Sequence, residues 1–244
     1  MMLVLFLIFG LLMGSFLNVL ISRIPRGESI VLPPSHCITC AHRLSGWDLI
    51  PVFSFLLLGG RCRYCRSKIS WQYPCIETVT AALTVLCWNQ FGWSLECMVM
   101  LLLVYGLIVI ALIDFFHQII PNVLTIPLIV LGFLFQWWQG DLLQALLGGI
   151  IGGGILWLIV LIYPKGMGMG DVKYLAMVGV FVGWLKAIFI LFLGSFLGVV
   201  VIVPLVLLGW LDRKQPFAFG PFLVIGTILV IFLPKLITLV LPSF

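Results

Sequence analysis

Long apolar runs separated by short polar connections occupy most of the chain. Most of these runs approach or exceed the roughly 20 residues that an α-helix needs to cross the ~30 Å hydrocarbon core of a bilayer. We place membrane spans at residues 2–21, 75–92, 96–115, 120–138, 141–163, 172–184, 186–210 and 219–241. The pattern therefore predicts an all-α polytopic membrane protein with about eight transmembrane helices.

The composition agrees with this pattern. Of the 244 residues, 63% are hydrophobic and 9% are charged, compared with about 25% charged residues in an ordinary soluble domain. A soluble globular protein is therefore excluded. The first run has no basic segment before it and no small-residue cleavage site after it, so we expect a retained helix rather than a secretory signal.

Lysine and arginine residues gather in three loops that the predicted spans place on one side of the membrane. The loops 22–74, 164–171 and 211–218 contain or flank eleven of the thirteen basic residues. Because cytoplasmic loops collect Lys and Arg, we expect these loops in the cytoplasm and the N-terminus on the opposite side. The net charge of +5 comes from basic residues in these loops, where membrane orientation explains them. We therefore expect membrane lipid, and not nucleic acid, as a partner of this protein.

Residues 22–74 are the one compositional break in the chain, rich in Arg, Pro, Ser and Cys. We divide the chain accordingly into a first transmembrane helix (1–21), a small cytoplasmic module (22–74) and a transmembrane helical bundle (75–244). The apolar stretch Leu49–Leu58 is too short to cross a bilayer. We expect it to form the module's own core or to lie on the membrane surface.

Two CxxC pairs, Cys37–Cys40 and Cys62–Cys65, lie in this module with 21 residues between the inner cysteines. Four thiolates on two tight turns form a tetrahedral ligand set for Zn²⁺, and a module of about 50 residues has little core of its own to hold it together. We therefore predict a structural zinc site made of Cys37, Cys40, Cys62 and Cys65. The alternative is that they are free or redox-active thiols.

Two acidic residues stand at ends of predicted spans on the cytoplasmic side. Asp114 follows the apolar run 98–113, and Asp171 follows the glycine-rich segment 166–170 and opens the sixth span. The three alternating glycines Gly166, Gly168 and Gly170 permit a positive φ, so the backbone can bend sharply there and another segment can approach closely. The sixth span is about 20 Å long, and we expect Asp171 to lie below the membrane surface.

Two carboxylates that meet in a partly dry site share one proton, because both cannot ionise cheaply. Aspartic proteolysis uses this arrangement: the ionised member takes a proton from the attacking water, and the protonated member donates to the developing oxyanion. Lys173 could tune the local field or bind a substrate carboxylate. The alternative is that Asp114 and Asp171 are solvated residues at helix ends.

With these residues in place, the chain resembles the type IV prepilin leader peptidases, a bacterial family of GxGD intramembrane aspartic proteases. Residues 168–173 resemble the family's second aspartate motif, and Asp114 with residues 120–125 resembles the first. Further family motifs are matched in order by residues 14–19, residues 23–25, the cysteine pairs, Tyr73-Pro74 with Glu77, and residues 219–222.

The resemblance implies two activities at the cytoplasmic face of the bacterial inner membrane, with the N-terminus periplasmic. One is cleavage of a basic leader from prepilins and type II secretion pseudopilins after a Gly. In this reaction Asp114 and Asp171 are catalytic, Gly168, Gly170 and Lys173 shape the site, and no cofactor is needed. The other activity is methylation of the new N-terminal residue, with S-adenosylmethionine as cofactor.

Asn18, Arg23 and Glu77 are the candidates for methylation, because they are polar residues at the membrane edge beside the cysteine module. Each also has a structural alternative: an interhelical hydrogen bond for Asn18, an anchor at the inner membrane surface for Arg23, and a counter-charge for the Arg-rich loop for Glu77. Two other functions stay open, namely a peptidase that does not methylate and a small transporter whose intramembrane carboxylates bind protons or ions.

Overall fold

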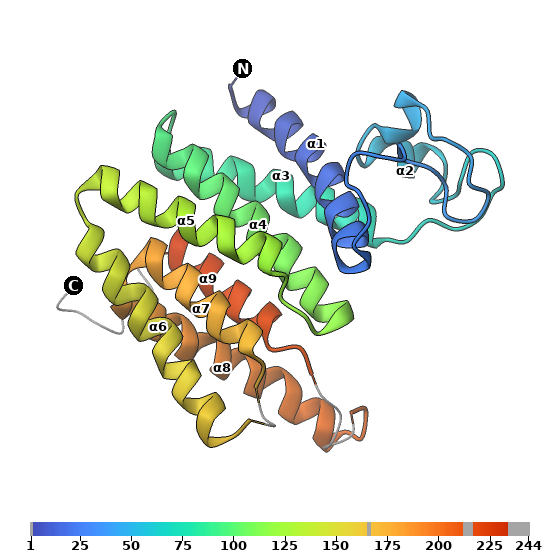
Figure 1. Cartoon of the computed structure of the whole chain (residues 1–244). Coiled ribbons are helices and arrows are strands. Elements are labelled where there is room, and N and C mark those ends of the chain that lie inside the picture. The colour runs from blue at the N-terminus through green and yellow to red at the C-terminus, as the bar shows by residue number, and fades with distance from the viewer. Residues whose placement is uncertain (1, 165–166, 212–216, 234–244) are drawn as a thin grey trace. The chain divides into compact units, whose positions relative to one another are not determined.

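A computed structural model describes residues 2–164, 167–211 and 217–233. These residues form helices and no strand, and the chain divides into two compact units, Met1–Val109 and Ile110–Phe244. The α-helices, shown in Figure 1, are α1 (Met2–Arg23), α2 (Phe53–Leu57), α3 (Gln72–Phe91), α4 (Leu95–His117), α5 (Asn122–Gln139), α6 (Leu142–Ile162), α7 (Met169–Val182), α8 (Trp184–Leu207) and α9 (Gly220–Phe232). Two short 3₁₀ helices, η1 (Ile24–Arg26) and η2 (Gly46–Leu49), lie between α1 and α2.

Each predicted span coincides with one of these helices, which confirms the all-helical fold class. Among the described residues, five helices are long and apolar enough to cross a membrane by themselves, namely α1, α4, α5, α6 and α8. Helix α7 has 14 residues, and α9 has 13 within the described range. The expected end of the last span, and the basic residues Lys165, Arg213, Lys214 and Lys235, lie outside the described residues, so eight crossings stay a prediction.

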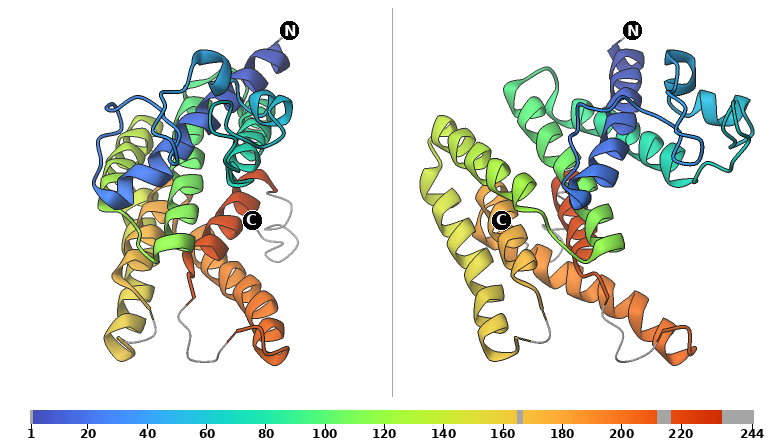
Figure 2. Two further views of the ribbon diagram at one scale, coloured as in Figure 1. Left: turned by 90° about the vertical axis from the view of Figure 1, so that its right-hand side faces the viewer. Right: turned by 45° about the vertical axis from the view of Figure 1, so that its right-hand side comes forward.

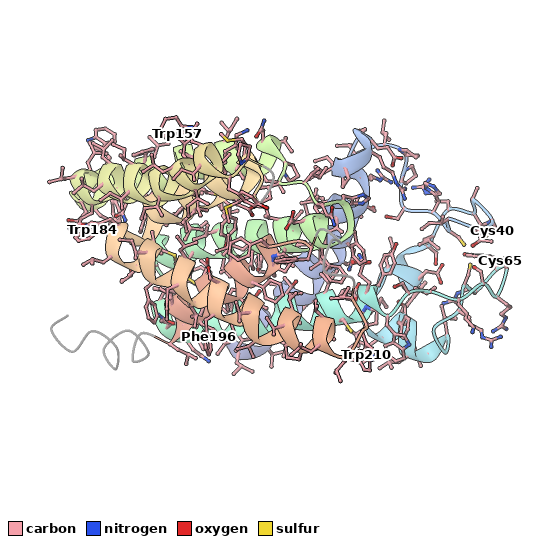
Figure 3. All side chains as sticks on the ribbon, turned by 90° about the horizontal axis from the view of Figure 1, so that it is seen from below. Cys40, Cys65, Trp157, Trp184, Phe196 and Trp210 are labelled. Carbon is pink, nitrogen blue, oxygen red and sulfur yellow. The ribbon has the colours of Figure 1, made fainter. Side chains whose placement is uncertain are left out.

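The outer surfaces of these helices are apolar, as a membrane environment requires. In α8 the most apolar stretch has a mean hydropathy of 2.9, yet only 17% of it is buried within the protein. Figure 3 shows Trp157 and Phe196 directed outward from α6 and α8, where both side chains are exposed. Exposed apolar surface of this extent is unfavourable in water, so these faces belong in lipid.

Unit 1 is built on close packing between α1 and α3. Two glycines one turn apart on α1 allow it: a Cβ at Gly10 would lie 2.6 Å from the Cα of Ala81, and a Cβ at Gly14 would lie 2.6 Å from the Cα of Glu77. Small residues at this spacing let two helix backbones approach closely. The contact brings the polar face of α1 against the start of α3.

The segment between α1 and α3 folds into a separate lobe beside the ends of these two helices (Figures 1 and 2). Within the predicted apolar stretch, Phe55 is buried and packs on Trp71, with ring centroids 4.8 Å apart. Phe53, Leu56 and Leu57 on the same short helix α2 are exposed. One side of this stretch is therefore core, as expected, and the other presents an apolar face.

Unit 2 has α7 at its centre, packed against α5, α6 and α9. Gly148 of α6 and Gly179 of α7 touch backbone to backbone, with no room for a Cβ on either residue. The side chain of Tyr174 is fully buried, and its hydroxyl forms a 2.8 Å hydrogen bond with Thr227 of α9. These contacts hold the first turn of α7, and the carboxylate on it, in a defined place.

Candidate functional site

The two aspartates that the sequence singles out both lie in unit 2, and both are buried. Asp114 is in the last turn of α4 and is 6% exposed; Asp171 is in the first turn of α7 and is 9% exposed. Gly170, next to Asp171, packs on Ile120, six positions after Asp114, so the two aspartate segments lie side by side although 57 positions separate the aspartates in the chain. The geometry brings together the pair that aspartic chemistry needs.

Asp114 is held by a contact that the sequence analysis did not anticipate. The backbone N–H of Gly220, the first residue of α9, donates a 2.9 Å hydrogen bond to Asp114 Oδ2. A Cβ at position 220 would lie 2.6 Å from the same oxygen. The start of a helix presents unpaired N–H groups and partial positive charge to a carboxylate. The motif at residues 219–222 was the only signal of this role.

The glycines before Asp171 act by close approach rather than by a left-handed turn. Gly168 is the N-cap of α7 with φ −85° and ψ 153°, so it is extended, and Gly170 already lies within the helix. Neither glycine uses the positive φ that it permits, because α7 starts at Met169 and takes Asp171 into its first turn; Gly166 lies outside the described residues. A Cβ at Gly170 would lie 3.0 Å from the Cβ of Ile120, and this is the contact that requires glycine.

Lys173 links the two aspartate motifs. Its ammonium group donates a 2.9 Å hydrogen bond to Asn122 Oδ1, at the start of α5. Asn122 belongs to the segment that follows Asp114, as does Ile120, which packs on Gly170. Two independent contacts thus hold the segment after Asp114 against the segment that carries Asp171.

The four cysteines of the loop converge in unit 1. Their sulfur atoms all lie within 4.8 Å of one another, and Figure 3 shows Cys40 and Cys65 next to each other at the end of the lobe. Two matching turns bring them there: the N–H of Ala41 bonds to the carbonyl of Cys37, and the N–H of Arg66 bonds to the carbonyl of Cys62. Ala41 and Arg66 both have a positive φ, 56° and 61°.

This cluster has the dimensions of a zinc site. With Zn–S bonds of about 2.3 Å, a tetrahedral site places its sulfurs about 3.8 Å apart, and the sulfurs of Cys37 and Cys65 are 3.8 Å apart. A backbone hydrogen bond from Cys40 lowers the pKa of Cys37 to about 6. In contrast, and despite a backbone hydrogen bond from His42, burial and the neighbouring thiols raise the pKa of Cys40 to about 11. Four thiolates would therefore need a cation among them.

The three methylation candidates meet at one end of the α1–α3 pair, but their contacts differ. Arg23 donates to the carbonyls of Ser29 and Pro33, at 2.8 and 2.7 Å, and so fastens the start of the loop. Asn18 and Glu77 line a cavity of about 210 Å³. The Glu77 carboxylate accepts a 2.7 Å hydrogen bond from the N–H of Val52. Within the described residues it forms no ion pair of 4.0 Å or less with an arginine, and the alternative role of Glu77 as a counter-charge for the loop stays open.

Comparison with known proteins covers nearly the whole chain. Residues 8–91 match the family model described as the bacterial Peptidase A24 N-terminal domain, and residues 101–203 match the type IV leader peptidase family. No solved structure matches the chain significantly.

Curated relatives named "Prepilin leader peptidase/N-methyltransferase" are similar over most of their length. The relative from Pseudomonas aeruginosa is 35% identical, and that from Neisseria gonorrhoeae is 34% identical; each alignment covers 90% of this chain and 86% of the relative. A relative from Myxococcus xanthus is 36% identical over 80% of this chain and 60% of its own length. With both family models matched in order and the aspartates buried together, the chain belongs to the type IV leader peptidase family and is similar throughout to its prepilin leader peptidase/N-methyltransferases.

Proposed function

We propose that this protein is an inner-membrane enzyme that cleaves the leader from prepilins and pseudopilins and methylates the N-terminus that cleavage creates. The observation that supports the peptidase activity is that Asp114, in the last turn of α4, and Asp171, in the first turn of α7, are both buried in the same compact unit. The relatives carry both activities in their names. We infer that the substrates are prepilins with a basic leader, cut after a Gly.

In this proposal one of the two aspartates, Asp114 or Asp171, acts as the general base of peptide hydrolysis and the other acts as the general acid. The ionised carboxylate takes a proton from water as the water oxygen attacks the scissile carbonyl, and the protonated carboxyl donates to the oxygen on which charge develops. Collapse of the tetrahedral intermediate breaks the C–N bond, and the leaving amine takes up a proton. Gly170 keeps the backbone near Ile120, and Lys173 holds Asn122 in place, so both shape this site. Proteolysis by this route uses no cofactor.

Methylation needs a methyl donor, and we propose S-adenosylmethionine, which would supply an electrophilic methyl group. Asn18 and Glu77 line the cavity of about 210 Å³ beside the end of α1 and the start of α3. Arg23 has a structural role in this proposal, because two of its five N–H donors are bonded to the loop carbonyls of Ser29 and Pro33. The cysteine cluster would hold Zn²⁺ and keep residues 22–74 folded as a cytoplasmic module between the first helix (1–21) and the bundle (75–244).

A cleavage assay with a purified prepilin tests the peptidase part. We expect Asp114→Asn and Asp171→Asn each to abolish cleavage, because an amide can neither take the proton of the attacking water nor donate as an acid. Asp141→Asn is the matched control, since Asp141 lies in the connection before α6 and should cleave at the wild-type rate. Cleavage at the wild-type rate by both active-site variants would refute the mechanism.

Mass spectrometry of the cleaved pilin tests the methylation part. With S-adenosylmethionine present, the mature N-terminus should carry one added methyl group. An unmodified N-terminus after complete cleavage would identify a peptidase without methylation activity, in which the cysteine module supports the fold or docks the substrate.

A further inference from the structure

Two buried acceptors, Asn18 and Glu77, line the cavity of about 210 Å³ beside α1 and α3 in unit 1, and one of them has an oxygen without a hydrogen-bond partner. Asn18 is 2% exposed, and its amide nitrogen donates to the carbonyls of Gly14 and Tyr73. Its oxygen, Oδ1, is the one buried side-chain polar atom in the described part of the chain with no hydrogen-bond partner. A buried acceptor of this kind is costly unless a donor reaches it.

Glu77 adds a negative charge to the same cavity. Its carboxylate is 6% exposed and accepts hydrogen bonds from Val52 N–H and from the Ser15 side chain. A carboxylate has room for about four donors. Within the described residues, the only ion pair of 4.0 Å or less joins Arg63 to Asp48, so Glu77 forms no direct ion pair, although Arg23 and Arg26 line the same cavity. A buried carboxylate without a direct ion pair calls for a cationic donor.

The backbone at Val52 is strained in the conformation that serves Glu77. Val52 has φ 62° and ψ −49°, and the N–H of Phe53 bonds to the carbonyl of Pro51 at 2.6 Å, which makes a γ-turn with a positive central φ. This turn is rare, and a β-branched residue with a positive φ is a genuine outlier. Strain of this kind persists where surrounding structure fixes it, and it clusters at ligand sites. Here it aims the Val52 N–H at the carboxylate.

The other charged groups around the cavity are engaged or exposed. Asp48 accepts from Arg63, Ser45 and Tyr64, and the Arg23 guanidinium is held by loop carbonyls. Glu28 and Arg26 are exposed at the rim. Of the buried polar side chains that line the cavity, Asn18 and Glu77 therefore offer acceptors, and Arg23 is turned to the loop carbonyls with two of its five N–H donors.

We propose that Asn18 Oδ1 and the Glu77 carboxylate form a binding site for an aliphatic ammonium group. The site rests on the proposed methylation, which brings two such groups to the enzyme: the α-amine of the cleaved pilin and the amine of the methyl donor. At about 210 Å³ the cavity is smaller than the roughly 300 Å³ of a small-molecule site, so it takes the ammonium end of its ligand. The adjoining cavity of about 360 Å³, which shares Leu44, Phe55 and Tyr73 with it, takes the remainder.

Two pairs of probes separate the sources of the ammonium group. One pair is a short peptide with a free N-terminal Phe and the same peptide with that amine acetylated. The other pair is S-adenosylhomocysteine and its N-acetyl derivative. Binding to the full-length protein in nanodiscs is measured by calorimetry. For the probe that uses the site, we expect acetylation to weaken binding at least about ten-fold, because it removes the charge that a buried carboxylate pairs with. No loss in either pair would overturn the proposal.

The variant Glu77→Gln tests whether the loss of binding on acetylation arises at Glu77. It keeps the side-chain shape and removes the charge, so the free and acetylated probes should bind it equally. Glu96→Gln, in the first turn of α4 and outside the cavity, is the matched control and should keep the wild-type ratio. An unchanged ratio in Glu77→Gln would refute the site.

A second measurement uses the wild-type protein alone and so does not depend on the folding of a variant. The free probe, and not the acetylated one, should protect Glu77 from modification by a hydrophobic carbodiimide, as mapped by peptide mass spectrometry. Equal modification with both probes would contradict the proposal. Methylation by the same preparation is measured in parallel: an unmodified cleaved pilin refutes the proposed methylation, while the probe ratios still decide the ammonium site.

Discussion

At the residue scale, the position of Asp114 in the proposed active site depends on Gly220, which has no side chain. Its N–H is the hydrogen-bond donor to Asp114 Oδ2, and the space beside its Cα is filled by the carboxylate itself. We therefore propose that Gly220 is a positioning residue: its backbone orients one of the two proposed catalytic carboxylates, and its lack of a side chain leaves room for that carboxylate at the start of α9.

Substitution of Gly220 by alanine tests this role. The added Cβ would lie 2.6 Å from Asp114 Oδ2, so the carboxylate must shift, and we expect cleavage to fall at least about ten-fold, since misplacement of about 1 Å can cost 100-fold. The loss should appear in kcat rather than KM, as measured with a prepilin substrate.

Gly154→Ala is the control, because a Cβ at Gly154 meets nothing within 4 Å. Equal kcat values for Gly220→Ala, Gly154→Ala and the wild type would show that the Asp114 contact does not govern the reaction.

At the scale of the elements, glycine pairs set the distances between helices. Gly148 on α6 and Gly179 on α7 leave no room for a Cβ where the two backbones touch. Helix α7 carries Asp171 at its start, so the spacing of α6 and α7 also determines where that carboxylate lies.

We expect Gly148→Val to destabilise the protein by about 1–3 kcal/mol, the usual cost of overpacking, and to lower its melting temperature in detergent. Gly154→Val, six positions along the same helix and facing open space, should melt within about a degree of the wild type on the same reasoning. If both variants melt alike, the close contact between α6 and α7 is not a source of stability.

We expect the fold of the lobe between α1 and α3 to depend on a metal ion held by the four cysteine sulfurs. We expect the purified protein to contain about one Zn²⁺ per chain, measured by inductively coupled plasma mass spectrometry, and Cys62→Ser to lose most of it. Cys75→Ser, which removes an exposed thiol outside the cluster, should retain the metal. A wild-type protein purified without metal would favour the alternative of free or redox-active thiols.

At the scale of the whole molecule, the distribution of basic residues predicts how the protein lies in the membrane. Arg43, Arg61, Arg66 and Lys68 are exposed on the lobe between α1 and α3, and the cytoplasmic excess of basic residues predicts that this lobe faces inward. The substrates proposed above carry a basic leader, so the same rule would hold that leader on the side of the lobe.

Added trypsin tests this orientation. It should cut the lobe in inside-out membrane vesicles and leave it intact in spheroplasts, where the periplasmic face is outside. Detergent should make both preparations equally sensitive, which controls for access. Cutting in intact spheroplasts would reverse the proposed orientation.

The helical fold class, the membrane environment and the two aspartates could be read from the sequence, because hydropathy needs only local composition and a charge within an apolar run is conspicuous. The cysteine pairs were equally visible, since CxxC spacing is a local pattern. None of these inferences required knowledge of which helices touch.

What only the tertiary structure decided were contacts between distant segments: Gly220 on Asp114, Lys173 on Asn122, and Val52 on Glu77. A backbone N–H carries no sequence signature, and a strained φ at a valine runs against local preference, so neither can be predicted from composition or spacing. The contact of Gly170 with Ile120 is of the same kind. The glycines permit a close approach, but only the tertiary structure decides which backbone conformation they adopt and which distant residue they meet.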